Sequence, residues 1–443
     1  MAEIIQPRKA CSINPLRMSQ PLGGAMAFMG LDGAMPLFHG SQGCTAFGLV
    51  LLVRHFREPI PFQTTAMNEV TTILGGHDNL EQAILNIRGR AKPAIIGICT
   101  TGLVETRGED MKGDLKLIRA RHPELADLAL VAVNTPDFEG ALQDGWAKVV
   151  TALVEQLVDP EPGPRQPDLV NVLAGCHLTP GDVEEVRAIV ESFGLEAIVL
   201  PDIGGSLDGH VPADWAGHTQ GGTGLADIAR MNRACATLAL GEQMRPAAEL
   251  LETTRGVPAR MFDRLTGLGA VDAFIAALAE ISGRPVPAVL RRQRSQLQDA
   301  MLDGHFQFGR RRVAVAAEPD LLFAMTSFLA EMGAEVAAAV TSTTSPVLAR
   351  VPAARVVVGD LDDLEQAAMA TRCELVVTHS HGRQMASRLG IPLFRAGFPM
   401  FDRVGAAHRV SVGYRGTRDL VFEIANLLLD AAGEGSHAAA QAH

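Results

Sequence analysis

The chain has 443 residues, a formal net charge of −11 and an apolar fraction of 47%. This length exceeds one ordinary hydrophobic core and predicts about three domains. The acidic balance argues against nucleic acid as the main partner, because phosphate binding needs a basic face. No run reaches about 18 apolar residues, and the first ten residues lack an apolar signal-peptide core. We therefore expect a cytoplasmic protein without a membrane partner.

Strands and helices alternate along most of the chain, which predicts parallel βαβ units. The buried strands that we expect lie at 94–99, 128–133, 169–173, 197–200, 335–340, 355–358 and 374–378. The first ten residues are polar, and we expect them to be loosely held. The proline-rich segment 159–167 is the clearest linker.

The predicted fold class is thus α/β, with three Rossmann-like αβα domains built on parallel sheets. We expect an N-terminal domain at 1–158, a second at 168–300 and a third at 301–430. The residues that follow, 431–443, are rich in Ala, Gly and His, and we expect a disordered tail there.

Six cysteines are spread along the chain, and none of them forms a Cys-x-x-Cys pair. They stand at positions 11, 44, 99, 176, 235 and 373. Such a spread argues against a disulfide framework in a cytoplasmic chain. It also argues against a self-contained zinc or iron–sulfur motif, whose ligands normally cluster. A cluster bound here needs ligands from distant parts of the chain or from another chain.

The segment around Cys44 has the composition of a ligand-binding turn. A short apolar run ends at His39, Gly40 and Gly43 bracket a polar turn, and we expect a helix at 47–53. A cysteine at a helix start meets amide donors and the positive end of the helix dipole, which favour the thiolate. The thiolate is the form that binds iron or zinc. For an isolated cysteine, a buried free thiol beside a structural turn is the simpler interpretation.

Three further segments carry polar groups without a clear metal or nucleotide signature. Arg54, His55 and Glu58 follow the expected helix, and we expect them to pair with each other or with its last carbonyls. The glycine-rich loop at 218–224 lacks the Lys-Ser/Thr of a phosphate loop, so no nucleotide site is expected there. The histidines at 379 and 381 follow a strand and suit a hydrogen-bonding loop pair.

Several blocks together resemble the nitrogenase component 1 superfamily of αβα subunits. The resemblance runs from about residue 11 to 429, and the middle third contributes only its α/β rhythm. The blocks that carry it are Ile13-Asn14-Pro15, Gln20-Pro21-Leu22-Gly23, His39-Gly40-Ser41-Gln42-Gly43-Cys44, Arg54-His55-Phe56-Arg57-Glu58-Pro59, Gly75-Gly76, Thr100-Thr101, Ser380-His381-Gly382-Arg383, Arg395-Ala396-Gly397-Phe398-Pro399 and Asp402-Arg403.

The resemblance implies one metal ligand in this chain. In the family, the β subunit of the molybdenum–iron protein uses three cysteines for half of an eight-iron cluster, and they would align with Ser19, Cys44 and Gly102. This chain keeps one thiolate of the three, so the resemblance implies a [4Fe–4S] cluster shared with a partner that supplies the other ligands. Cys44 is then the metal-binding and cofactor-binding residue, and Cys11 and Cys99 are structural.

This ligand pattern resembles the β-like subunit of the scaffold on which the nitrogenase iron–molybdenum cofactor matures. The resemblance implies a NifE-like α subunit as partner in an α2β2 heterotetramer, with the cofactor precursor held mainly by that partner. It further implies transient docking of the nitrogenase Fe protein and of cofactor-delivery proteins. No catalytic acid, base or nucleophile is visible, so we expect a scaffold subunit rather than an enzyme.

Three alternatives stay open at this point. The first is the β-type subunit of a two-component reductase, such as dark-operative protochlorophyllide reductase, in which the ligand from this subunit is typically an aspartate. The second is the nitrogenase β subunit itself, which Ser19 and Gly102 disfavour. The third is a nucleotide-sugar-binding α/β protein, which leaves the cysteine turn unexplained.

Overall fold

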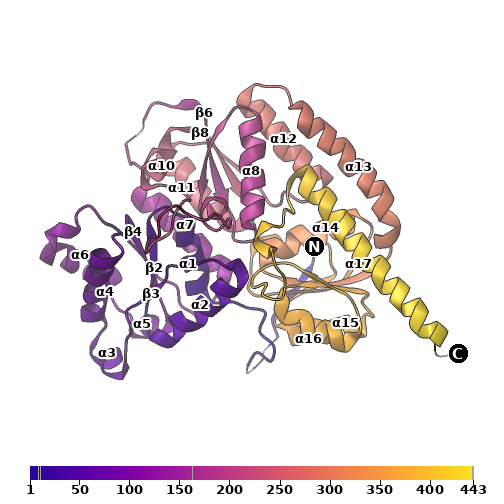
Figure 1. Ribbon diagram of the computed structural model, residues 1–443, viewed down its shortest axis with the longest axis horizontal. Coiled ribbons are helices and arrows are strands. Elements are labelled where there is room, and N and C mark those ends of the chain that lie inside the picture. The colour runs from indigo at the N-terminus through magenta and orange to yellow at the C-terminus, as the bar shows by residue number, and fades with distance from the viewer. Residues whose placement is uncertain (8, 10, 162, 442–443) are drawn as a thin grey trace.

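The computed structural model describes residues 1–441 apart from 8, 10 and 162, and side chains are described as far as residue 432. Three parallel sheets form three units, which lie at the lower left, the top and the lower right of Figure 1. Helices pack around each sheet, and the central strands are buried, which explains why those strands are continuous apolar runs. The predicted α/β class with Rossmann-like units on parallel sheets is confirmed.

The first unit contains the sheet β3-β2-β4-β5. Its strands are β2 (Ala34–His39), β3 (Gln63–Thr64), β4 (Ile95–Thr100) and β5 (Ala129–Val133). Its helices are α1 (Gln20–Met29), α2 (Gln42–Phe56), α3 (Glu69–Leu74), α4 (His77–Arg90), α5 (Gly102–Arg107), α6 (Met111–Arg121) and α7 (Leu142–Leu157).

The second unit contains the sheet β7-β6-β8-β9. Its strands are β6 (Gln166–Ala174), β7 (Glu196–Leu200), β8 (Ala234–Leu240) and β9 (Ala259–Phe262). The helices that follow in the chain are α8 (Pro180–Ser192), α9 (Ile203–Ser206), α10 (Leu225–Ala229), α11 (Arg245–Arg255), α12 (Leu268–Ser282) and α13 (Ala288–Phe308).

The third unit contains the sheet β1-β12-β11-β10-β13-β14. Its strands are β1 (Glu3–Ile5), β10 (Arg312–Ala317), β11 (Glu335–Thr341), β12 (Arg355–Val358), β13 (Leu375–Thr378) and β14 (Leu393–Arg395). Its helices are α14 (Pro319–Glu331), α15 (Leu361–Ala370), α16 (Arg383–Leu389) and α17 (Gly413–Gln441), and the short 3₁₀ turn η6 (Ala406–His408) precedes α17.

The two chain ends differ from the sequence expectation. The first residues are not loosely held, because β1 pairs in parallel with β12 at the edge of the third sheet. A three-residue strand is too short to show a periodic pattern, and its partner lies far away in sequence. At the other end, α17 continues through the expected tail at 431–443 as far as Gln441, and 442 and 443 lie outside the described residues. The domain boundaries stay predictions.

A polar network joins the three units in the interior, and we call Gln143, Gln243 and Asp320 the closed junction. The Asp320 carboxylate accepts from the backbone N–H and the side-chain amide of Gln243, at 3.0 and 2.9 Å. The Asp320 N–H donates to the Gln143 side chain at 3.2 Å. All three side chains are buried, and burial raises the pKa of Asp320 to about 6.

Candidate metal-cluster site

Cys44 lies at the carboxyl edge of the first sheet. β2 and β4 are neighbours in parallel register, with His39 opposite Thr100, so α2 and α5 begin side by side at this edge. The polar turn predicted before the helix is already helical, because α2 begins at Gln42 and Cys44 lies in its first turn. The side chain is therefore exposed at a helix N-terminus rather than after a loop.

The surroundings of Cys44 suit an anionic ligand. The Ser41 hydroxyl lies 3.4 Å from the Cys44 Sγ, and Ser41 makes no side-chain cap bond to the helix amides. The N-cap of α1, Ser19, likewise makes no side-chain cap bond. First-turn N–H groups and the helix dipole favour negative charge at such a position. The arrangement offers amide donors to the sulfides of a bound cluster.

The segment 137–139 lies between the other two positions that the resemblance aligned with cluster ligands. Gln20, next to Ser19, donates from its side chain to the Glu139 carbonyl at 2.9 Å. A Cβ added to Gly102 would lie 2.0 Å from the Asp137 carboxylate. A cysteine side chain at position 102 would have to displace the exposed Asp137 carboxylate, and Ser19 has no thiol. Cys44 is the one thiol of the three aligned positions.

Four of the remaining cysteines differ from Cys44 in their burial. Burial raises the pKa of their thiols, which keeps each in its protonated form. These four are Cys99, Cys176, Cys235 and Cys373. Cys11 is exposed, but its neighbours Ser12 and Ile13 donate to Asp360, the N-cap of α15 in the third unit.

The sequence predicts that Arg54, His55 and Glu58 pair with each other or with the end of α2. The structure shows other contacts for these residues. The buried His55 accepts the backbone N–H of Met400 through Nδ1 at 2.8 Å, and burial lowers its pKa to about 4. The Arg54 guanidinium lies 4.4 Å from the ring centre of Phe401. Both residues thus fix the far end of α2 to the third unit. Glu58 points instead into a cavity.

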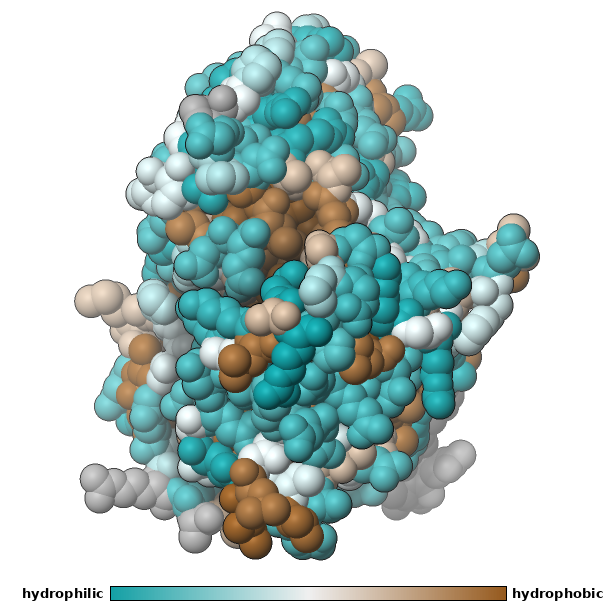
Figure 2. Space-filling model, turned by 90° about the vertical axis from the view of Figure 1, so that its left-hand side faces the viewer, coloured by the Kyte–Doolittle hydropathy of each residue, from teal (hydrophilic) through white to brown (hydrophobic). Residues whose placement is uncertain are grey.

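An exposed apolar surface accompanies Cys44 on the first unit. Phe47, Val50 and Val53 follow Cys44 at helical spacing along α2, with exposed fractions of 69, 52 and 41%. On α3, Val70, Ile73 and Leu74 are also exposed. Figure 2 shows an apolar patch at the bottom of the face it displays, where α3 lies in Figure 1. We call these six residues the apolar face.

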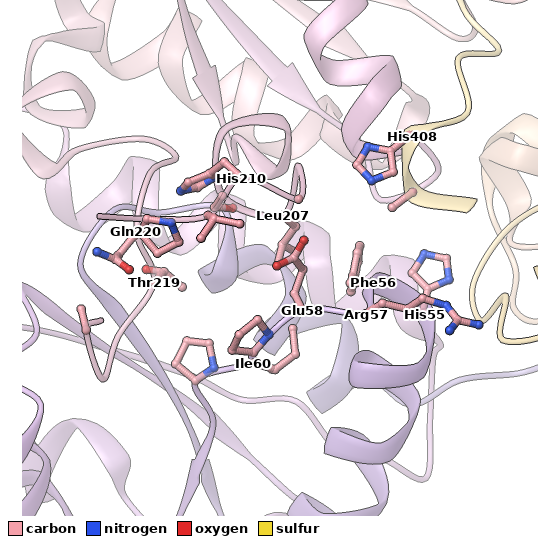
Figure 3. Close-up of a pocket in the computed structure, with 18 of the residues that line it drawn as sticks. His55, Phe56, Arg57, Glu58, Ile60, Leu207, His210, Thr219, Gln220 and His408 are labelled. Atoms are coloured by element: carbon pink, nitrogen blue, oxygen red, sulfur yellow. The ribbon is translucent and has the colours of Figure 1, made fainter. Parts of the chain in front are cut away.

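Sequence reasoning missed a cavity of about 620 Å³ between segments of all three units. Its walls come from the end of α2 and the residues after it, from the loop between α9 and α10, and from η6 (Figure 3). Imidazoles, one carboxylate and apolar side chains line it. No local motif could have revealed it, because its histidines at 55, 210, 218 and 408 are spread along most of the chain.

Comparison with known proteins defines the class. The family described as Nitrogenase component 1 type Oxidoreductase matches residues 19–429, and the chain belongs to this family. A solved structure described as "Nitrogenase Cp1 at pH 6.5" superposes with a TM-score of 0.90 at 32% identity, over 96% of this chain and 95% of that chain.

Within this family, relatives that align with nearly the full chain share one description. The Nitrogenase iron-molybdenum cofactor biosynthesis protein NifN of Bradyrhizobium diazoefficiens is 60% identical over 431 residues, which cover 97% of this chain and 92% of the relative. The protein of the same description from Klebsiella pneumoniae is 41% identical, with 97% and 93% covered. Within the described part of this chain, we find no helix with the length and apolarity to cross a membrane.

Proposed function

We propose that this chain is the β-type subunit of a scaffold for biosynthesis of the nitrogenase iron–molybdenum cofactor. Its similarity to relatives with that description over nearly the full chain supports the role. The fold supports an α-type partner, because the family to which it belongs is that of nitrogenase component 1. In this role the chain completes an assembly and relays electrons, and the cofactor precursor lies mainly in the NifE-like partner.

The observation that carries the cluster proposal is the exposed Cys44 thiol at the start of α2. One thiolate and the nearby amide groups suffice for one corner of a [4Fe–4S] cluster, if the partner supplies the other three ligands. Ser19 and Gly102 offer no further thiolates, which disfavours an eight-iron cluster of the nitrogenase β-subunit type. The presence of a thiol at 44, rather than a carboxylate, disfavours the reductase alternative.

The apolar face supports the proposed position of the partner. Six exposed aliphatic or aromatic side chains on α2 and α3 are costly to leave in water. A cluster ligated from two chains requires the interface to pass directly beside Cys44. Docking of the Fe protein and of cofactor-delivery proteins then takes place on the assembled complex.

Substitution of Cys44 tests this proposal. In the complex purified with its α-type partner, Cys44→Ala should remove or strongly reduce the electron paramagnetic resonance signal of one reduced [4Fe–4S] cluster per αβ pair and slow cofactor maturation. Cys44→Ser should retain a weakened cluster through its oxygen, with an altered potential. Cys11→Ala, an exposed thiol, and Cys99→Ala, a buried one, are the matched controls and should keep the signal. A full cluster in Cys44→Ala with loss in either control would refute the assignment.

A further inference from the structure

A buried hydrogen-bond network lies directly before the turn that carries Cys44, and cluster ligation alone does not account for it. Its centre is His39, the last residue of β2, whose side chain is completely buried. All other residues of β2 are apolar and buried. A polar side chain in such a place costs free energy unless it has hydrogen-bond partners, so the partners of His39 show what it stabilises.

Both ring nitrogens of His39 have a partner. Nε2 lies 3.1 Å from the Glu109 carboxylate, and Nδ1 lies 3.0 Å from the Thr65 hydroxyl. The hydrogen bond from His39 lowers the pKa of Glu109, which is therefore ionised and can only accept, so the shared proton lies on Nε2. In the neutral ring, Nδ1 then accepts the Thr65 O–H. The imidazole thus joins the Glu109 carboxylate to Thr65.

Thr65 extends this link to the backbone before Cys44. Its hydroxyl oxygen accepts the Gly40 N–H at 3.0 Å. Gly40 precedes Ser41, the N-cap of α2, whose hydroxyl lies 3.4 Å from the Cys44 Sγ. Because its O–H bonds to His39 and its lone pair accepts the Gly40 N–H, Thr65 fixes where α2 begins. The position of the Cys44 thiol therefore depends on it.

The other side of the same turn is held by Thr101, the N-cap of α5. Its N–H and its hydroxyl both donate to the His39 carbonyl, at 3.1 and 3.2 Å. A Cβ added to Gly40 would lie 2.1 Å from the Thr101 hydroxyl oxygen, so a larger residue there would push Thr101 aside. The backbone on which α2 starts is thus held from both sides.

Helix α3 is anchored on the same network at both of its ends. Before α3, the Met67 N–H donates to the Gly40 carbonyl at 2.9 Å. After α3, the Gly76 N–H donates to the second carboxylate oxygen of Glu109 at 3.1 Å. The α3 part of the apolar face and the start of α2 therefore rest on one set of buried hydrogen bonds.

We propose that His39 is a positioning residue for Cys44. Oriented by Glu109, its imidazole holds Thr65 on the Gly40 N–H, which fixes the start of α2 and the place of the thiol. The inference rests on the cluster proposed at Cys44 and adds the side chains that place its ligand. Hydrogen bonds to the sulfurs tune the reduction potential of a cluster, so a displaced start of α2 should change that potential before it removes iron.

Substitution of Thr65 tests the proposal with a matched control. Thr65→Val removes the acceptor of the Gly40 N–H and keeps the shape of the side chain, and Thr65→Ser restores the hydroxyl. Thr417→Val is the control, because Thr417 is also buried and accepts a glycine N–H, that of Gly267, at 3.1 Å in the first turn of α17. Both valine variants should lower the melting temperature by similar amounts, so a difference between them at Cys44 does not come from lost stability.

The first readout is the reactivity of the thiol in the full-length chain freed of iron with a chelator. Cys44 and Cys11 are both exposed, so their rates of alkylation by iodoacetamide can be compared within one molecule by mass spectrometry. Thr65→Val should slow alkylation of Cys44 by about threefold or more, because the amide donors are no longer held beside the thiol. Cys11 should not change, and Thr65→Ser and Thr417→Val should react like the wild type. An unchanged rate at Cys44 in Thr65→Val would overturn the proposal.

The second readout separates the two contacts of the imidazole. In His39→Asn the amide can replace Nδ1 at Thr65 but is too short for Glu109, whereas in His39→Gln it can replace Nε2 at Glu109 but not Nδ1 at Thr65. His39→Asn should therefore stay closer to the wild type in the reactivity of Cys44, and His39→Gln should resemble Thr65→Val. The reverse order would overturn the route through Thr65.

The cluster itself distinguishes failure of this inference from failure of the proposed function. In the complex purified with the α-type partner, Thr65→Val should keep its iron but shift the midpoint potential of the [4Fe–4S] cluster, whereas Thr417→Val should not. Cys44→Ala is the reference. If Cys44→Ala retains the cluster, the proposed function fails, and this inference fails with it. If Cys44→Ala loses the cluster while Thr65→Val keeps the wild-type potential, the positioning role alone is wrong.

Discussion

The carboxyl edge of the first sheet and the closed junction are built from the same kinds of element but differ in their exposure to solvent. Both lie where parallel strands end and helices begin. At the first edge, Cys44 is exposed and apolar side chains stay in contact with water. At the closed junction, Asp320 is fully buried, with donors from another unit on its carboxylate. The topology allows a ligand site at every such edge, and intramolecular packing decides which edge remains available for one.

Opening the closed junction should have the largest effect on the stability of the chain. Asp320→Ala leaves the backbone N–H and the side-chain amide of Gln243 buried without their acceptor. We expect the free energy of unfolding to fall by about 3–5 kcal/mol. Urea unfolding followed by circular dichroism measures it, and a loss below about 1 kcal/mol would show that water replaces the carboxylate and that the junction is not closed.

The same carboxylate should give the junction a dependence of its stability on pH. The folded pKa of Asp320 is raised from 3.8 to about 6, so the folded state holds a proton that the unfolded state releases. The contribution of this bound proton to the free energy of unfolding is complete below pH 3.8 and is lost as the pH rises through 6. The difference is about 3 kcal/mol. His177 has its pKa lowered to about 4 and works in the opposite direction.

The comparison with Asp320→Asn isolates this titration. The free energy of unfolding of the wild type minus that of Asp320→Asn should fall between about pH 4 and pH 6 and remain level above that range. Cys44→Ala provides the control, because it should leave the pH profile of the wild type unchanged. Parallel profiles of wild type and Asp320→Asn would contradict the assignment.

His55 fixes the far end of α2 to the third unit, and its removal should have an intermediate effect. His55→Ala removes the acceptor of the Met400 N–H and leaves a cavity where the imidazole packs between Phe56 and Phe398. We expect a loss of about 2–3 kcal/mol in stability and a lower yield of complex, with unchanged iron per complex that survives. Arg54→Ala removes an exposed cation–π contact and should cost less than about 1 kcal/mol. Loss of iron from fully assembled His55→Ala would instead make this residue part of the cluster environment.

The apolar face should show the smallest effect on the chain itself. Phe47→Ser and Ile73→Ser replace side chains that are 69 and 77% exposed, so the free energy of unfolding should change by about 0.5 kcal/mol or less. Co-purification with the α-type partner should nevertheless fall. Leu302→Ser on α13, which is 67% exposed but lies on another unit, is the control. Unchanged co-purification in both apolar-face variants would place the partner elsewhere.

The sequence predicted the regular parts of the molecule and missed contacts between distant segments. The strand expected at 94–99 is β4 at Ile95–Thr100, because a run buried on both faces is visible from composition alone. The start of α2 was placed too late, since Gly40 and Gly43 suggested a turn where the helix already begins. The roles of His55 and Glu58 could not be predicted, because their partners lie in loops of the third and second units.

The pairing of β1 with β12 closes the polypeptide on itself. The chain begins in the sheet where its last third folds, then passes through the first and second units before it returns. The three units are therefore not independent domains joined end to end. A cut in the linker near 160 would leave both fragments joined through a shared sheet. A tag fused at the N-terminus extends an edge strand, whereas one fused at the C-terminus extends a helix that ends away from the three sheets (Figure 1). A purification tag should therefore be fused at the C-terminus.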